Sequence, residues 1–113
     1  MRSALPVLNP LLHQPVRTQI VAFLSGRGEA TFSELKRTLG ITDGNLGAHL
    51  HKLVEAELVE TRDGPGAGRS QTVFFLTDGG RGALAEYIAR LSELVQFSAG
   101  AASRLSVAPE PNT

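Results

Sequence analysis

One segment of the sequence carries polar side chains of the types that contact nucleic acids, at a spacing that a single helix would bring together. Leu46, Leu50 and Leu53 recur at intervals of three and four residues, which predicts a helix with one apolar face. The opposite face then receives the polar residues Thr42, Asp43, Asn45, His49 and Lys52. We interpret this face as a candidate DNA-contacting surface, with an ordinary solvated helix surface as the alternative.

The chemistry of these side chains suits a duplex. The Asn45 amide can pair with both polar atoms of an adenine edge, and Thr42 can contact either a base or the backbone. His49 can donate to a base or a phosphate, while the Lys52 ammonium suits a phosphate.

A second candidate surface is the glycine-rich stretch 63–68, which Arg62 and Arg69 flank. Guanidinium groups bind phosphates, and glycines permit close approach of the chain to a ligand. We therefore expect Arg62, Arg69, Ser70 and Gln71 to contact the DNA backbone. A solvent-exposed turn with two solubilising arginines is the alternative.

Other kinds of site have little support in the sequence. The chain has no cysteine, and His49 and His51 stand two residues apart, so they face different directions on a helix. We therefore predict no metal site and no cofactor. No serine-histidine-aspartate arrangement or carboxylate pair stands out, so we predict no enzyme activity. The stretch 1–12 is interrupted by prolines and too short for a signal sequence or a membrane span, so we expect a cytoplasmic protein without membrane contact.

The charge balance is an objection to DNA binding. The 11 basic and 11 acidic residues give a formal net charge of +0, whereas phosphate neutralisation favours basic domains. A local positive surface would answer the objection, because local potential steers DNA. It would require the acids Glu55, Glu57 and Glu60 to lie away from the basic groups Arg17, Lys36, Arg37, Lys52, Arg62 and Arg69.

The elements that must position these residues follow from capping, periodicity and turn residues. We predict helices over 15–25, from the cap Ser33 to Gly40, from the cap Thr42 to about residue 57, and after Thr77-Asp78. A short extended piece at 30–32 and strands at 58–62 and 70–77 complete the pattern. The predicted domain covers 1–97, with a flexible tail over 98–113. The fold class is α+β, mainly α, with the element order of a winged helix-turn-helix: a two- or three-stranded wing and a C-terminal dimerisation helix.

Three stretches, Leu8–Arg17, Gly40–Leu50 and Leu76–Arg81, make the chain resemble the small winged-helix transcriptional regulators related to the MarR and ArsR groups. The resemblance implies that Thr42–Leu53 is the recognition helix, that Arg62–Gln71 is the wing, and that the terminal helices pair two subunits. It also implies repression, and it offers sensing of an unidentified small-molecule effector as one possibility, with regulation through a partner protein or through the dimer equilibrium as the alternatives. The cysteine-rich or histidine-rich pattern of metal-sensing relatives is missing here.

The apolar residues near both ends exceed what one small core needs, and they predict a homodimer. The residues expected at its interface are Leu8, Leu11, Leu12, Tyr87, Leu91 and Leu94. A two-fold dimer with recognition helices about 34 Å apart would select a pseudo-palindromic operator in double-stranded DNA. The alternative for the last helix is packing on its own domain. For the whole chain, the alternatives are a protein-interaction module and a DNA-binding protein without sequence preference.

Overall fold

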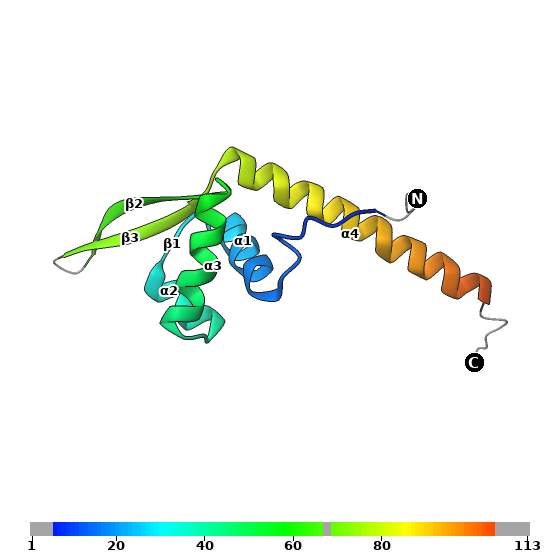
Figure 1. Ribbon diagram of the computed structural model, residues 1–113, viewed down its shortest axis with the longest axis horizontal. Coiled ribbons are helices and arrows are strands. Elements are labelled where there is room, and N and C mark those ends of the chain that lie inside the picture. The colour runs from blue at the N-terminus through cyan, green and yellow to red at the C-terminus, as the bar shows by residue number, and fades with distance from the viewer. Residues whose placement is uncertain (1–5, 67–68, 106–113) are drawn as a thin grey trace.

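The computed structural model describes residues 6–66 and 69–105. Its elements are, in chain order, α1 (Pro15–Arg27), β1 (Ala30–Thr31), α2 (Phe32–Leu39), α3 (Asp43–Glu55), β2 (Val59–Gly66), β3 (Arg69–Leu76) and α4 (Asp78–Leu105). Figure 1 shows α1, α2 and α3 gathered into one body, from which the β2–β3 hairpin and α4 extend in opposite directions. This arrangement confirms the predicted winged helix-turn-helix.

The sheet has three antiparallel strands in the order β1-β3-β2. The long hairpin pairs Val59 with Leu76 at its base and Gly66 with Arg69 near its tip, while Ala30 pairs with Phe74 on the other side of β3. The short extended piece predicted at 30–32 is thus the third strand of the wing sheet.

The N-terminal cap of α2 corrects the prediction made for Ser33. Thr31 is the cap: its hydroxyl accepts a hydrogen bond from the Glu34 amide at 3.1 Å. The Glu34 carboxylate in turn accepts from the Thr31 amide at 2.9 Å, which completes a capping box. Ser33 lies inside the helix, because the reciprocal pair at Thr31 satisfies more of the free amides than a lone serine could.

The turn between α2 and α3 sets the geometry of the helix-turn-helix. Gly40 ends α2 with φ 67°, a left-handed conformation that glycine adopts without steric cost. Two residues later Thr42 caps α3, as predicted, and its hydroxyl accepts from the Asn45 amide at 3.2 Å. The tight turn therefore directs α3 away from α2 at once.

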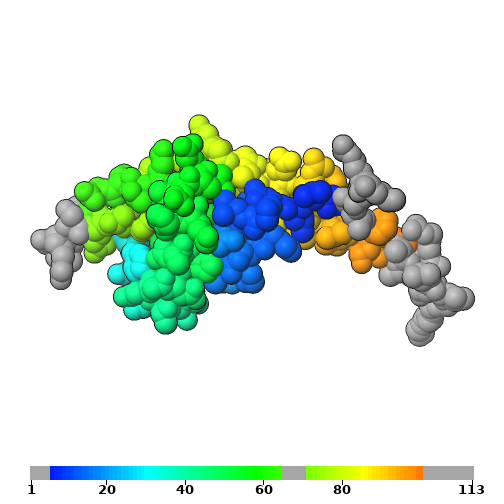
Figure 2. Space-filling model, viewed as in Figure 1, coloured from blue at the N-terminus to red at the C-terminus, as the bar shows by residue number. Residues whose placement is uncertain are grey.

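The core lies where α1, α2, α3 and the sheet meet. Its fully buried side chains are Leu12, Ile20, Val21, Leu24, Leu35, Leu46, Leu53, Val59 and Leu76. The three leucines predicted to form the apolar face of the recognition helix, Leu46, Leu50 and Leu53, are all buried. In Figure 2 the segment before α1 lies against α4 and covers part of it.

α4 is longer than predicted. It continues to Leu105, so 98–105 is helical and the flexible tail predicted from residue 98 is corrected for these positions. Alanines at positions 99, 101 and 102 explain the extension, since alanine has the highest helix propensity and the first proline follows only at 109. Residues 106–113 lie outside the described part. No helix within 6–66 and 69–105 is long and apolar enough to cross a membrane.

Candidate nucleic-acid interface

The exposed face of α3 contains small residues at its centre and polar residues along one side. Successive helix residues are rotated by about 100°, so Gly44, Ala48 and Glu55 lie directly opposite the buried leucines. Asn45 and Lys52 are exposed beside this line, as predicted. Near the N-terminal end of α3, only Gly44 and Ala48 stand at the centre of the face, which leaves room for a groove wall close to the backbone. Sequence reasoning did not assign Ala48 a role, because its type carries no chemistry.

Asp43 is committed to an ion pair. Its carboxylate lies 2.8 Å from the Lys36 ammonium of α2, so the first turn of α3 is tied to the preceding helix. Both side chains remain substantially exposed. Asp43 was predicted as a DNA contact; in the structure its carboxylate neutralises Lys36, which would otherwise face a phosphate freely.

His49 lies at the edge of the exposed face that is next to α1. Its ring is half-buried, and its Nδ1 lies 3.1 Å from Nη1 of Arg17. Burial is the main cause that holds the pKa of His49 below its ordinary range, and the charges of Arg17 and Lys52 lower it further. His49 is therefore neutral at physiological pH.

The wing residues are less uniform than predicted. The Arg62 guanidinium forms an ion pair with Glu29, which precedes β1. Arg62 pairs with Val73 in the sheet, four residue pairs below Gly66–Arg69, or about 13 Å from the tip. The prediction that Arg62 flanks the tip is thus corrected, because the hairpin is longer than the glycine-rich run. Gln71 is exposed nearer the tip, and the side chains of Arg69 and Ser70 lie outside the described part.

The charged groups are only partly sorted. Lys52 belongs to α3, Lys36 reaches its first turn, and Arg17 reaches its middle. Glu55, which was expected to lie apart, is on the outer face of the same helix and within 3.5 Å of His51. It stands at the C-terminal end, about 16 Å along the axis from Gly44. The N-terminal half of α3 is therefore where a duplex would approach.

The predicted dimer residues fall into two groups. Leu12 and Tyr87 are 1% and 6% exposed within a single chain, so they leave no surface for a second copy and are removed from the predicted interface. They belong to the core because the segment before α1 folds back against α4. Leu8, Leu11, Leu91 and Leu94 are half-buried. The exposed apolar residues of α4 are Ile88, Val95 and Phe97, none of which is among the six residues expected at the interface.

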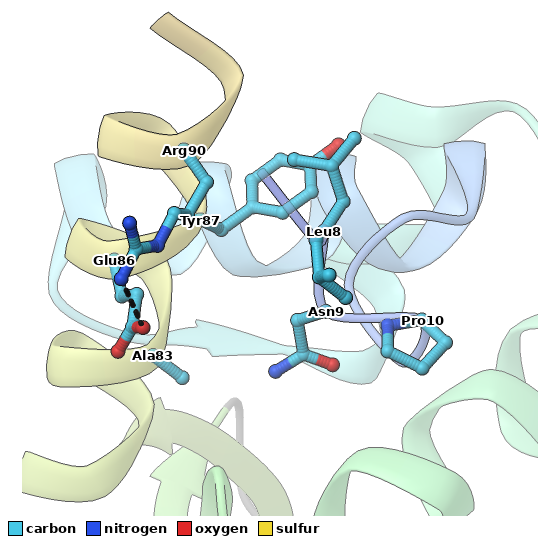
Figure 3. A pocket seen from close by; sticks show the side chains of 8 residues that line it. Leu8, Asn9, Pro10, Ala83, Glu86, Tyr87 and Arg90 are labelled. Carbon is cyan, nitrogen blue, oxygen red and sulfur yellow. Dashed lines mark ion pairs between the residues drawn. The ribbon is translucent and has the colours of Figure 1, made fainter. Parts of the chain in front are cut away.

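A hollow of about 290 Å³ lies between the segment before α1 and α4. Figure 3 shows Leu8, Asn9 and Pro10 on one side and Ala83, Glu86, Tyr87 and Arg90 on the other. The charges of Arg90 and Glu86 are directed at each other, 3.6 Å apart.

Comparison with known proteins places these features in a family. Residues 16–95 match the family model described as a winged helix DNA-binding domain. The uncharacterized protein MJ0432 of Methanocaldococcus jannaschii is 39% identical over 84 residues, which cover 74% of this chain and 91% of that protein.

Solved structures of transcriptional regulators are similar to most of this chain. A transcriptional regulator homologue from Pyrococcus horikoshii OT3 is 34% identical with a TM-score of 0.71, over 76% of this chain and 85% of that one. YodB from B. subtilis is 25% identical with a TM-score of 0.70, over 77% and 85%. The transcriptional repressor CouR, bound to a 23-mer DNA duplex, is 25% identical with a TM-score of 0.66, over 79% and 63%.

Proposed function

The chain belongs to the winged helix DNA-binding domain family, and from this we propose that it binds a specific operator in duplex DNA as a homodimer and represses transcription by occupying that operator. It is a DNA-binding protein of the transcriptional-regulator type. The observation that carries the finer proposal is the exposed N-terminal half of α3, where Gly44 and Ala48 permit close approach and Asn45 stands beside them. A helix of this width fits the major groove with its N-terminal residues at the base edges.

Polar residues on and beside α3 have roles in this proposal. Asn45 reads an adenine edge, and Thr42 donates its hydroxyl proton to a phosphate or base while its oxygen caps the helix. Lys52 and Lys36 contact phosphates on either side of the groove. In the wing, Gln71, Arg69 and Ser70 contact the neighbouring backbone.

The dimer proposal rests on the projecting half of α4. Leu84, Ile88, Leu91 and Val95 follow each other at intervals of four, three and four residues, which is the spacing of a helix-pairing seam. Among the side chains that the structure describes, Leu91 is the last residue of α4 against the core, whereas Ile88 and Val95 are 55% and 59% exposed. An unsupported helical extension with exposed apolar side chains is marginal in water, so a second copy of α4 is its natural partner. The hollow of Figure 3 lies beside this helix, and it is the proposed binding site for a small-molecule effector.

The experiment is an anisotropy titration against labelled genomic fragments, including the promoter of the gene itself, at several salt concentrations. One fragment should bind far more tightly than the rest, and its affinity should fall with salt. Asn45→Ala should weaken that complex about tenfold or more, since one bidentate base contact contributes about 1–3 kcal/mol. Gln96→Ala on α4 is the matched control and should bind as the parent does.

Two other outcomes would each replace the proposal. Equal affinity for all fragments with a steep salt dependence would mean DNA binding without sequence preference. No binding at low salt would favour a protein-interaction module. Two observations favour that second candidate: the chain has zero net charge, and the acid Glu55 lies on the outer face of α3.

A further inference from the structure

Arg17 lies on α1, yet its guanidinium makes two contacts with other parts of the chain. Its Nε donates to the carbonyl oxygen of Leu11 at 2.6 Å, and its Nη1 lies 3.1 Å from Nδ1 of His49 on the recognition helix. The Leu11 carbonyl belongs to a turn that Asn9 holds, because the Asn9 side chain accepts from the Leu11 amide at 2.9 Å. The Leu11 carbonyl thus fixes the position of the Arg17 guanidinium, and the guanidinium in turn fixes the position of the His49 ring.

This contact determines which ring nitrogen of His49 carries the proton. A guanidinium has donors and no acceptor, so Nδ1 of His49 must be the acceptor. In the neutral ring the proton is then on Nε2. His49 consequently offers a hydrogen-bond donor, and no acceptor, to anything that meets its Nε2.

We propose that Arg17 is a positioning residue for DNA recognition: it holds His49 in the Nε2–H form, so that His49 donates to a phosphate oxygen or to an acceptor atom of a base in the major groove. The inference rests on the proposed function, since it needs α3 to enter the groove. A donor at this position can pair with guanine N7 and O6, adenine N7 or thymine O4, and it cannot accept from the amino groups of adenine or cytosine. Arg17 thereby reduces the set of bases that His49 can contact, although Arg17 itself touches no base.

The electrostatics of the site also favour the neutral form of the His49 ring. The groups that face His49 are Arg17 of α1 and Lys52 of α3, both cationic, and burial adds to their effect in lowering the pKa of the ring. Protonation of Nδ1 would place a proton against the guanidinium and break the contact. The neutral donor form therefore predominates above neutral pH, and DNA affinity of the parent should change little between about pH 7.5 and pH 8.5.

The direct test is nitrogen NMR of the histidine rings in the full chain without DNA. The parent should show His49 protonated at Nε2, with a titration midpoint below the ordinary histidine value of about 6.5. In Arg17→Met the two neutral forms should mix and the midpoint should rise toward that value. Arg27→Met is the matched control, because it removes the same charge from the far end of α1 and should leave His49 unchanged. A His49 that is protonated at Nδ1 in the parent, or unaltered in Arg17→Met, would overturn the proposal.

DNA titrations with the preferred fragment then separate positioning from charge. Arg17→Met should weaken binding about threefold to tenfold at pH 8, the effect of one hydrogen bond, and should regain affinity as the pH falls and the freed ring becomes cationic. His49→Gln, which keeps an amide donor and cannot titrate, should bind nearly as the parent does. Arg17→Lys keeps the charge and loses the two-pronged contact, so it should resemble Arg17→Met in the NMR experiment and in its pH dependence.

The outcomes for the two proposals are distinguishable. If Asn45→Ala weakens binding while Arg17→Met and Arg17→Lys both bind as the parent does, Arg17 has no positioning role and the regulator proposal stands. If Arg17→Lys binds normally and Arg17→Met does not, Arg17 acts only as a cation near phosphate, which also overturns the inference. If no α3 variant affects DNA binding, the proposed function itself fails.

Discussion

At the scale of single residues, the candidate interface is defined by which charges are already paired. Three of the six basic groups expected to form a positive surface have different partners in the structure: Lys36 has Asp43, Arg62 has Glu29, and Arg17 has His49. An exposed ion pair contributes at most about 1 kcal/mol to stability, so a phosphate can compete for the cation. If Lys36 and Arg62 contact phosphate as proposed, DNA affinity should depend on the acids Asp43 and Glu29, which compete with phosphate for these two cations.

Asp43→Asn tests this tuning. The substitution removes a negative charge from the end of α3 where we propose that the duplex approaches, and it frees Lys36, so affinity for the preferred fragment should rise about threefold or more at low salt. The slope of log affinity against log salt should steepen by up to about one unit, the contribution of one additional phosphate contact. Loss of an acid from the first turn of a helix should cost about 0.5 kcal/mol of stability.

Anisotropy at three or more salt concentrations measures both quantities. Glu86→Gln on α4 is the control, since it removes the same charge from a different element. Equal gains in the two variants would mean that total charge is responsible and that the Lys36–Asp43 pair has no special part.

At the scale of elements, the start of α4 is set by a close backbone contact. A Cβ added at Gly80 would lie 2.1 Å from the carbonyl oxygen of Leu58, in the link between α3 and β2. The same carbonyl accepts from the Thr77 amide at 3.0 Å, so it cannot easily move. The direction of α4 relative to α3 thus depends on the absence of one methyl group at position 80.

Gly80→Ala should accordingly destabilise the fold by about 3 kcal/mol, because the overlap is with backbone and α4 must shift to relieve it. Gly82→Ala, two residues further on, meets nothing within 4 Å and should instead stabilise the helix by about 0.5–1 kcal/mol. Urea denaturation of both variants measures the difference. Equal stability for the two would contradict the close packing.

The capping box of α2 makes one contribution to stability depend on pH. The Thr31 amide, which donates to the Glu34 carboxylate, is the main cause that lowers the pKa of Glu34 from its ordinary value of 4.5. A group whose pKa is lower in the folded state stabilises that state above its unfolded pKa and loses the effect as the pH falls through the folded value. Glu34 therefore stabilises the protein at pH values above about 4.5.

Glu34→Gln should be less stable than the parent near neutral pH, because a neutral amide accepts a weaker hydrogen bond. The two proteins should converge in stability as the pH falls below about 4.5, since the parent then loses its carboxylate. Denaturant titrations across this range measure the difference. A constant gap at all pH values would show that the capping box does not shift the titration of Glu34.

At the scale of the whole molecule, the projecting half of α4 has apolar side chains that a single chain leaves exposed. Figure 1 shows it leaving the body on the side opposite the hairpin, so pairing through α4 would leave both wings and both copies of α3 free. Two-fold pairing also repeats the recognition helices, and a repeated helix requires a repeated half-site in the operator.

The double substitution Ile88→Glu, Val95→Glu should convert the proposed dimer to a monomer, because four carboxylates would be buried in the paired seam. Sedimentation measures the mass, and affinity for the full operator should drop by about 100-fold or more while a single half-site is still bound weakly. Ala89→Glu, exposed on the polar side of the helix, is the control and should remain dimeric. A parent protein that is monomeric at micromolar concentration would contradict the pairing.

Much of the architecture is determined by the sequence alone, because its causes are local. The intervals between Leu46, Leu50 and Leu53 predict the buried face of α3, and Thr42 caps that helix through an amide only three residues away. The wing sheet and the winged helix order were predicted for the same reason: turn residues and periodicity act over a few neighbours. The confirmed resemblance to transcriptional regulators rests on these local motifs.

Only the tertiary structure decided which residues far apart in the chain contact each other. Arg17 and His49 are 32 residues apart, and His13 and Tyr87, 2.9 Å from each other, are 74 apart. Periodicity assigns a residue to a face of its helix but does not specify what packs against that face. For this reason Leu12 and Tyr87 could be predicted to be apolar surface and prove to be core, and the partner that sets the protonated nitrogen of His49 could be found only once the chain had folded.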